Sequence, residues 1–273
     1  MNRIIVIGSS NIDFMGFPVN KLIPKDSNVG QVTISFGGVG RNICENLLRL
    51  GEKVTFFTCI GNDSYGKELE KELLDLKCNI ISPVTNERSA SYLCINDEHN
   101  DMVLAICDET ISKHLNIEFL EKHKNILESS EYIIFDGNLD EDVIDYIASN
   151  YNNKKLIADG ISTTKVRKFI NVMDKLYLFK VNQLEYEIIK ECKFPQNLIV
   201  TRGSKSLEYY DGLWHEVKVI PAEEVVSTTG CGDALLSGTI SSIVRGNNLD
   251  TAIQNGLALA RKTLSVKESV YKH

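Results

Sequence analysis

The strongest constraint on the fold of this chain is a regular alternation of short apolar segments with helical patterns. The segment RIIVIGSS at 3–10 is an apolar run that ends in glycine and serine, as a buried strand does. Similar apolar segments recur at 53–61, 132–137, 155–160, 175–182 and 197–203. Amphipathic helical patterns stand between them, at 41–51, 64–78, 140–151 and 183–192. Strands that alternate with helices predict an α/β fold with a mainly parallel central sheet and helices on both faces.

Two segments depart from this alternation and predict a second, smaller sheet. Residues 27–36 and 90–106 have the pattern of strands without helices between them, and the second contains a polar turn between two alternating runs. Such a pattern is typical of antiparallel hairpins. We therefore expect a single domain over residues 1–273, with a small antiparallel β lid formed by about 14–36 and 88–107.

Composition and charge limit the classes of partner. The chain has 273 residues, of which 43% are hydrophobic, and it carries a net charge of −7. This negative charge argues against general nucleic-acid binding and against an anionic membrane surface. No apolar run approaches the roughly 20 residues that a membrane helix needs. We expect neither nucleic acid nor membrane among the partners.

The seven cysteines and five histidines indicate neither a disulfide framework nor a metal site. The cysteine count is odd, no two cysteines form a C-x-x-C pair, and the chain opens on a strand pattern rather than a secretory signal. The histidines show no metal-ligand spacing. We expect reduced thiols and a cytoplasmic location.

Polar side chains follow several of the predicted strands. They are Asp13, Asp136, Asp159, Asn182 and Arg202. Ligands gather beyond the carboxyl ends of the strands in open parallel sheets, so these residues are candidates for a binding site. The alternative is that aspartate and asparagine simply favour turns.

Three glycines surround the start of the helical pattern at 41–51. In the segment FGGVGRN, Gly37, Gly38 and Gly40 would let a ligand approach the backbone, and the helix start would favour an anion or a polar hydroxyl. Glycines before helices are also common, and this order differs from G-x-G-x-x-G. The phosphate-binding motif G-x-x-x-x-G-K-[ST] is absent from the sequence.

A more specific segment lies at 228–238, TTGCGDALLSG, where a glycine turn leads into an apolar helical pattern. The backbone N–H groups of Gly230 to Asp233 would converge at the helix start and hold an anion or a charge that develops in a transition state. The carboxylate of Asp233 could then take a proton from an attacking hydroxyl. The alternative is an acidic residue that only stabilises the helix dipole. The segment predicts phosphoryl transfer from a nucleotide to an alcohol.

Four motifs in this order resemble the ribokinase-like carbohydrate kinase family: GGVGRN, NQLE, VTRG before a hairpin, and TTGCGDALLSG. The resemblance spans essentially the whole chain and implies the family's three-layer α/β fold, with ATP and Mg²⁺ as cofactors. Within the family, three segments are similar to pseudouridine kinases. They are SNVGQVTISFGGVGRNICENLLRLG, NDMVLAICDETI and DGISTTK, the last with Gly160 in place of the usual proline.

The resemblance implies roles for residues around the reacting hydroxyl. Asp233 would be the general base on a sugar 5′-hydroxyl, and Gly230, Cys231 and Gly232 would form the anion hole. The ribose hydroxyls would contact Asp13, Gly38 and Asn42. The similarity to pseudouridine kinases adds Ser27 and Lys165 as substrate contacts, with Tyr92 and Met102 closing over the base.

The resemblance also implies a nucleotide site. Asn182 and Glu185, the N-x-x-E element, would organise Mg²⁺ and phosphate through water. Thr201 and Gly203 would line the nucleotide site, together with Gly232, and Asn255 would lie near the adenine.

Two positions depart from the family pattern. Cys231 replaces the alanine of G-A-G-D, and its thiol is either reactive, because a helix start lowers a cysteine pKa, or simply a small buried side chain, which we favour. Ser227 stands where many relatives have an aspartate that helps bind a monovalent cation. The resemblance therefore leaves K⁺ activation open.

The interpretation that we favour is an ATP-dependent kinase that phosphorylates the 5′-hydroxyl of pseudouridine. Two alternatives stay open: a kinase for another nucleoside or a ribose-like sugar, and a non-catalytic nucleoside- or sugar-binding protein of the same fold. A projecting lid would expose apolar strand faces, and dimerisation would bury them. We therefore expect a homodimer formed through the lid.

Overall fold

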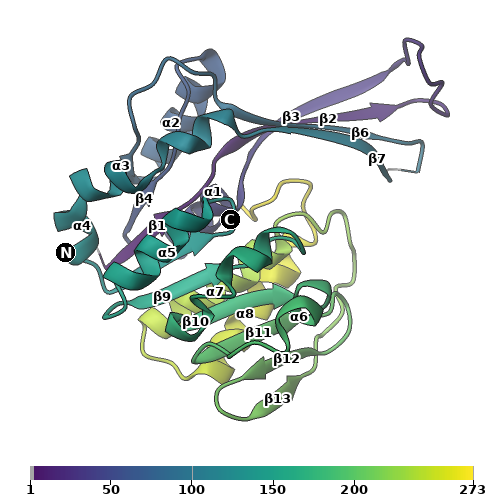
Figure 1. The fold of residues 1–273 in the computed structure, drawn as a ribbon. Helices are drawn as coiled ribbons and strands as arrows, with labels where there is room; N and C mark the ends of the chain where they lie inside the picture. Colours follow the sequence, from purple (N-terminus) through teal and green to yellow (C-terminus); the bar gives the residue numbers. More distant parts are fainter. Residues whose placement is uncertain (1–2, 100, 273) are drawn as a thin grey trace.

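A nine-stranded sheet forms the centre of the molecule in the computed structural model, which describes residues 3–99 and 101–272 (Figure 1). The strands in spatial order are β13 (Trp214–Val217), β12 (Leu207–Tyr210), β11 (Asn197–Thr201), β10 (Leu178–Asn182), β9 (Lys155–Asp159), β8 (Tyr132–Asp136), β1 (Ile4–Ile7), β4 (Val54–Phe57) and β5 (Asn79–Ile81). Neighbouring strands from β11 to β5 run parallel, and β12 and β13 add an antiparallel hairpin at one edge. The predicted α/β fold with a mainly parallel sheet is confirmed.

Helices cover both faces of this sheet and make three layers. One face carries α1 (Val39–Arg49), α2 (Ser64–Asp75), α7 (Cys231–Val244) and α8 (Leu249–Thr263). The other face carries α3 (Ile117–Lys122), α4 (Lys124–Glu128), α5 (Glu141–Asn150) and α6 (Gln183–Ile189), with the short 3-10 helices η1 (Thr110–His114), η2 (Lys165–Phe169) and η3 (Met173–Lys175). Figure 1 shows α7 and α8 side by side, and α1 also contacts α7.

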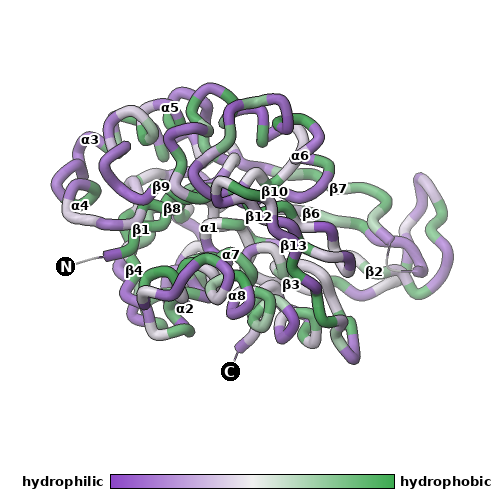
Figure 2. The backbone as a smooth tube through the Cα atoms, turned by 90° about the horizontal axis from the view of Figure 1, so that it is seen from below, coloured by the Kyte–Doolittle hydropathy of each residue, from purple (hydrophilic) through white to green (hydrophobic). Residues whose placement is uncertain are grey.

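Burial on both faces explains why the central strands are apolar throughout. In β1, Ile5 and Ile7 enter the hydrophobic cluster on one side, whereas Ile4 and Val6 enter the cluster on the other. Successive side chains of a strand point to opposite faces, so a strand between two helical layers needs apolar residues at every position. Figure 2 shows hydrophobic stretches along these strands and more hydrophilic stretches on the outer helices.

A second sheet of four strands projects from this body (Figure 1). Its strands in spatial order are β3 (Gly30–Gly37), β2 (Asn11–Pro18), β6 (Ala90–Asn96) and β7 (Met102–Asp108). The outer pairs, β2–β3 and β6–β7, are antiparallel, and β6–β7 is the hairpin predicted within residues 90–106. The central pair, β2–β6, is parallel because both strands leave the body in the same direction. We call these four strands the projecting sheet. Its closure as a lid stays a prediction.

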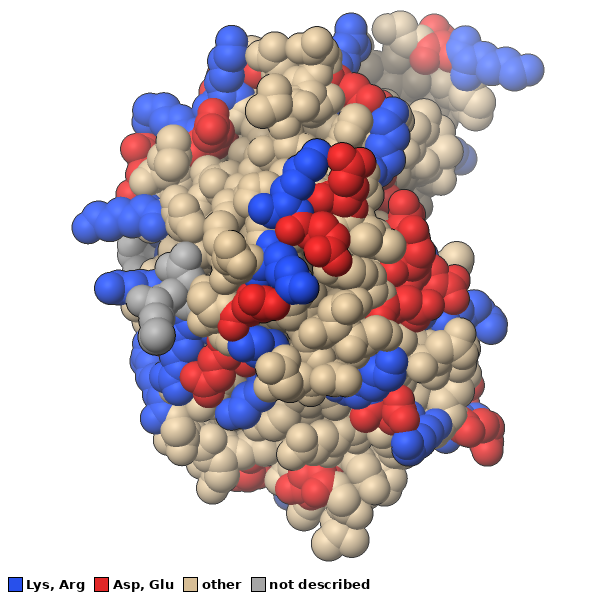
Figure 3. Space-filling model, turned by 60° about the vertical axis from the view of Figure 1, so that its left-hand side comes forward, with Lys and Arg blue, Asp and Glu red and all other residues tan. Residues whose placement is uncertain are grey.

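The outer surface is charged and mixed. On the face shown in Figure 3, Lys and Arg side chains lie interspersed with Asp and Glu side chains. Among the described residues, no helix has the length and apolar character needed to cross a membrane.

Candidate active site

The start of α7 is built on a glycine in the left-handed conformation. Gly230 has φ +77, and a Cβ at this position would lie 1.9 Å from the carbonyl oxygen of Ser269. Only glycine fits both the backbone conformation and this close approach. The turn brings Gly230, Cys231 and Gly232 to the N-terminus of a fourteen-residue helix, where the first N–H groups have no partner within the helix. The amide of Cys231 donates to the carbonyl oxygen of Thr228 over 3.3 Å.

Asp233, in the first turn of α7, is buried and held by α1. The Nδ2 atom of Asn42 donates to its Oδ2 over 2.8 Å. The Oδ1 atom of Asn42 in turn accepts from the hydroxyl of Ser269 over 2.9 Å, which fixes the amide orientation. Burial and the charge of Asp159 raise the pKa of Asp233 to about 7, against the opposing effects of Lys180 and Asn42. A carboxyl group with a pKa near neutrality is suited to exchange a proton during a reaction.

A buried cation that the sequence interpretation missed lies beside this carboxylate. The Nζ atom of Lys180, in β10, contacts Oδ2 of Asp159, at the end of β9, over 2.8 Å. A Cβ at Gly232 would lie 2.8 Å from Nζ of Lys180, so the ammonium group faces the start of α7. Burial lowers the pKa of Lys180, but Asp159 and Asp233 outweigh burial and raise it. The ammonium therefore supplies positive charge at the place where the sequence predicts a bound phosphate.

Asn182 and Glu185 form a capping box at the start of α6. Asn182 Oδ1 accepts from the amide of Glu185 over 3.0 Å, and Glu185 Oε2 accepts from the amide of Asn182 over 2.9 Å. Burial raises the pKa of Glu185, and the nearby Lys180 opposes this. Within residues 3–99 and 101–272, no group of three or more His, Cys, Asp or Glu residues could hold a metal ion directly. A metal held mainly by phosphate oxygens and water, with one buried carboxylate nearby, fits this donor set.

Asp13 lies on the projecting sheet rather than in a loop after β1, because β2 begins at Asn11 and includes it. Asn11 Nδ2 donates to its Oδ1, and a Cβ at Gly37 would clash with its carboxylate. Burial raises the pKa of Asp13 to about 6, and the charge of Arg41 opposes this. Gly38, with φ +96, caps α1 next to this group. The root of the projecting sheet thus brings Asp13 and Gly38 to the start of α1, whose Asn42 contacts Asp233.

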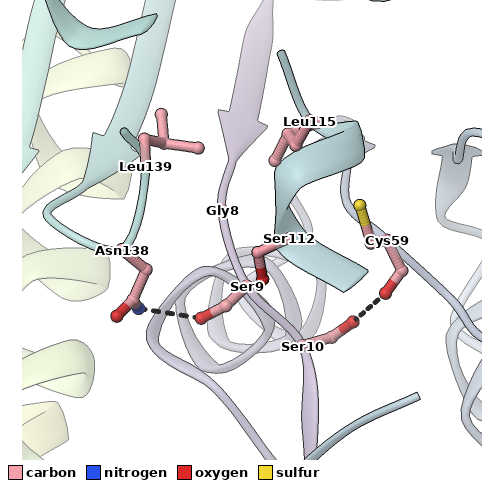
Figure 4. Close-up of a pocket in the computed structure, with 8 residues that line it drawn as sticks. All are labelled: Gly8, Ser9, Ser10, Cys59, Ser112, Leu115, Asn138 and Leu139. Carbon is pink, nitrogen blue, oxygen red and sulfur yellow. Dashed lines mark hydrogen bonds between the residues drawn. The ribbon is translucent and has the colours of Figure 1, made fainter. Parts of the chain in front are cut away.

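A small pocket lies between the end of β1 and the loop after β8 (Figure 4). Its lining residues are Gly8, Ser9, Ser10, Cys59, Ser112, Leu115, Asn138 and Leu139. Asn138 Nδ2 donates to Ser9 Oγ over 2.8 Å, and the amide of Asn138 donates to Oδ1 of Asp136 over the same distance. Burial raises the pKa of Asp136 to about 7, and its Oδ2 atom is buried without a hydrogen-bond partner.

Lys165, the first residue of η2, stands at the edge of this pocket. Its Nζ atom donates to Oδ1 of Asn138 and lies 3.3 Å from Oε1 of Glu109. Lys165 therefore lies near the carboxyl ends of β8 and β9, and its contact with a substrate stays a prediction. The sequence motifs assign no role to Asn138, which lies outside them, or to Glu109, which lies within the segment NDMVLAICDETI.

Several residues predicted as site residues lie away from the site around Asp233. Ser27 is exposed in the turn between β2 and β3, and Met102 is 63% exposed on β7, where its Sδ atom accepts from the hydroxyl of Tyr92 over 3.4 Å. Asn255 donates to Ser242 Oγ over 2.9 Å. It lines a cavity of about 260 Å³ between α7 and α8. Ser242 is eleven residues beyond Cys231, roughly 16 Å along α7. The structure thus does not bring Asn255 to the start of α7.

The end of β11 carries the two other residues predicted for the nucleotide. Thr201 is the last residue of β11, and Gly203 has φ +62 in the turn that follows. Between them, Arg202 pairs with Glu208 and Gln183, so its side chain holds the turn together.

Cys231 has the environment of a small, partly buried side chain rather than of a reactive thiol. Burial and the neighbouring charge of Asp233 raise its pKa to about 11. These two effects outweigh the expected influence of the helix start. The sulfur thus stays protonated near neutral pH, and the contribution of this residue at the helix start is its backbone.

This fold and this site together have the features of an enzyme that transfers an anionic group. A buried proton acceptor and a buried cation meet at a glycine-flanked helix start, at the carboxyl edge of a parallel sheet. Residues 1–271 match the family described as pfkB family carbohydrate kinase, and the chain belongs to that family.

Individual relatives agree with this assignment. The chain is 30% identical to the pseudouridine kinase of Escherichia coli over 266 residues, which cover 89% of this chain and 84% of the relative. It is 22% identical to the guanosine-inosine kinase of Exiguobacterium acetylicum, with 98% and 96% of the two chains covered. The nucleoside kinase of Methanocaldococcus jannaschii has the same fold, with a TM-score of 0.84, 20% identity and coverage of 98% and 93%. The predicted ribokinase-like fold is confirmed, and the protein is a sugar or nucleoside kinase of this family.

Proposed function

We propose that this protein is an ATP-dependent kinase that phosphorylates the 5′-hydroxyl of pseudouridine, giving pseudouridine 5′-phosphate and ADP. The observation that carries the kinase chemistry is the buried carboxylate of Asp233 at the start of α7, held by Asn42. The choice of pseudouridine is supported by the 30% identity to a pseudouridine kinase and by the similarity of the segments around Ser27, Met102 and Lys165.

In this reaction the γ-phosphoryl group of ATP moves to the substrate 5′-oxygen, and the hydroxyl proton moves to Asp233. The substrate 5′-oxygen attacks the γ-phosphorus of ATP and forms a new P–O bond, while the bond from that phosphorus to the bridging oxygen of ADP breaks. The proton of the 5′-hydroxyl passes to the carboxylate of Asp233. Backbone N–H groups at Gly230, Cys231 and Gly232 stabilise the charge on the moving phosphoryl group. Lys180, behind Gly232, adds positive charge to this cradle.

The remaining roles are those that the family resemblance implies. Asp13, Gly38 and Asn42 hold the ribose hydroxyls, and Thr201 and Gly203 line the nucleotide site. Asn182 and Glu185 hold Mg²⁺ through water. When bound, Mg²⁺ would neutralise the charge on the phosphate oxygens of ATP. Lys165 contacts the nucleoside, and Tyr92, Met102 and Ser27 approach it when the projecting sheet closes as a lid over the single domain. For Asn255 to contact the adenine, the nucleotide would have to extend along α7 from Asp233 to the cavity near Ser242.

We also propose that two copies of the chain associate through the projecting sheet. In register across its four strands, Ile34, Phe14, Leu93 and Ile106 share one face. Ile34, Leu93 and Ile106 are 49%, 42% and 58% exposed, although they are apolar. A second copy would cover this row and exclude water from it. Ile34→Glu should then shift the mass measured by analytical ultracentrifugation from dimer to monomer.

A cytoplasmic location is part of this proposal. All seven cysteines are free thiols, and four of them are buried. Free thiols persist in compartments that are kept reducing.

Two alternatives remain distinct from pseudouridine phosphorylation. The substrate could be another nucleoside or a ribose-like sugar, and the similarity to a guanosine-inosine kinase gives the first a specific basis. A non-catalytic binding protein would not need a base and a phosphate cradle. The intact arrangement of Asp233, Lys180, Asn182 and Glu185 therefore favours an enzyme.

A turnover screen tests the proposal. The purified protein is given ATP and Mg²⁺ with pseudouridine, uridine, adenosine, guanosine, inosine or ribose, and ADP release and product mass are measured. We expect the highest kcat/KM with pseudouridine. A higher kcat/KM with any other member of the set would replace pseudouridine as the substrate. Binding without ADP release from any of them would favour the non-catalytic protein.

A further inference from the structure

An ion pair joins the projecting sheet to the body beside the proposed nucleoside site. Glu109 follows the last residue of β7, and Lys165 begins η2 after β9. The distance from Lys165 Nζ to Glu109 Oε1 is 3.3 Å, and the two side chains are 28% and 36% exposed. Lys165 also donates to Asn138, which leaves one N–H of its ammonium group for another acceptor. The pair is therefore accessible to a ligand, because Lys165 keeps a hydrogen-bond donor that no group in the described part of the chain accepts from.

The surroundings of the pair place it between the ribose contacts and the small pocket. Glu109 accepts a hydrogen bond from the thiol of Cys107, and the charges of Lys165 and Asp13 also influence the pKa of that thiol. Cys107 stands opposite Tyr92, and Tyr92 stands opposite Asp13 in the register of the projecting sheet. On the other side, both Lys165 and Glu109 influence the pKa of Asp136 under the pocket. A base attached to a ribose held by Asp13 would therefore meet this pair.

We propose that Glu109 and Lys165 together recognise the lactam edge of the substrate base. This inference rests on the proposed nucleoside kinase function. A carboxylate only accepts hydrogen bonds and an ammonium only donates them, so the pair presents an acceptor beside a donor. A ring N–H next to a C=O is the complement of this pattern, and both ring nitrogens of pseudouridine carry such a hydrogen beside the C2 carbonyl. Glu109 accepts from the N–H, and Lys165 donates to the C=O.

The same pattern rejects bases with the opposite edge. In the orientation in which the N3–H and C2=O of pseudouridine meet Glu109 and Lys165, cytosine would place the lone pair of its N3 against the Glu109 carboxylate and its amino N–H donors against the Lys165 ammonium. Such a mismatch leaves partly buried charges without partners, which is costly. Glu109 is therefore a specificity-determining residue in this proposal.

The test compares substrates within one variant. The kcat/KM values of wild type and Glu109→Gln are measured with pseudouridine, cytidine and ribose, and the affinity for pseudouridine alone is measured by calorimetry without ATP. The amide keeps the size of the side chain but removes its charge. We expect kcat/KM and affinity for pseudouridine to fall about tenfold to a hundredfold, while ribose, which has no base, changes less than about threefold. Discrimination against cytidine should shrink by a similar factor.

Two comparisons make the result decisive. Glu118→Gln removes another lysine-paired carboxylate, which contacts Lys122 over 2.8 Å on α3 far from the site, and should leave all three substrates unchanged. Lys165→Ala should imitate Glu109→Gln, and the double variant should lose little more than either single one. Equal losses for pseudouridine and ribose, or no loss for either, would overturn base recognition and assign the pair to holding η1 and η2 together.

The wild-type measurements separate this inference from the proposed function. If wild type prefers another lactam nucleoside, such as inosine, pseudouridine is wrong as substrate while the variant still tests Glu109 on that nucleoside. If wild type turns over ribose and discriminates no nucleoside, both proposals fail.

Discussion

Asn42 donates a hydrogen bond from Nδ2 to Oδ2 of Asp233 over 2.8 Å and so joins α1 to the start of α7. The bond favours the charged form of the carboxylate, whereas burial and Asp159 favour the neutral form. The pKa of Asp233 settles at about 7 under these opposing effects. The contact therefore both orients the proposed base and sets the pH at which it can act.

Replacing this base should remove turnover and spare the nucleotide. We expect Asp233→Asn to lower kcat by about 10²–10⁴-fold, because an amide cannot take the proton of the attacking hydroxyl. The affinity for ATP, measured by calorimetry without the second substrate, should change little. Near wild-type turnover in a folded Asp233→Asn protein would exclude this role.

The hydrogen bond from Asn42 should be visible in the pH profile. Because it lowers the pKa of Asp233, its removal in Asn42→Ala should raise that pKa and move the acidic limb of the kcat/KM profile to higher pH. Ser269→Ala, which only loosens the orientation of Asn42, should give a smaller shift in the same direction. The expectation is contradicted if the midpoint of the acidic limb stays near 7 or moves to lower pH.

Cys231 provides a test of whether its backbone or its sulfur matters. The pKa of its thiol is raised to about 11, so the sulfur carries no charge at neutral pH. Cys231→Ala keeps the amide and should retain most of kcat and the KM for ATP. Complete loss of activity in a variant with an unchanged thermal unfolding midpoint would give the sulfur a chemical role.

Much of the fold was predictable because its signals are local. The central strands are continuous apolar runs, and each ends in a turn residue that the sequence displays, such as Gly8 after β1 and Gly137 after β8. The glycine-flanked start of α7 was predictable for the same reason. The parallel pairing of β2 with β6 was not, since nothing in either hairpin specifies how two hairpins lie against each other.

The contacts that complete the site are long-range, and this explains what the sequence interpretation missed. In the sequence, Lys180 is a single charged residue within an apolar strand. Only the fold brings Asp159, Gly232 and Asp233 next to its ammonium group. Ser269 is 227 residues from the Asn42 amide that it orients. The side chain of Asn255 donates to Ser242 Oγ, and its predicted place near the adenine stays a prediction.

Asp136 should make the protein less stable as the pH rises. Its carboxyl group is fully buried, one oxygen has no hydrogen-bond partner, and its pKa is raised to about 7 from an ordinary value near 4. The folded state therefore prefers the protonated form. The stability from this preference is complete below about pH 4 and is lost as the pH rises to about 7.

An asparagine at position 136 would stay neutral across this range and would keep an oxygen that accepts from the amide of Asn138. We therefore expect the free energy of unfolding of Asp136→Asn, relative to wild type, to increase between pH 5 and pH 8, by no more than about 4 kcal/mol. Urea unfolding of both proteins at the two pH values measures this difference, since the other titrating groups are common to both. If the two proteins lose stability in parallel over this range, Asp136 does not titrate there in the folded protein.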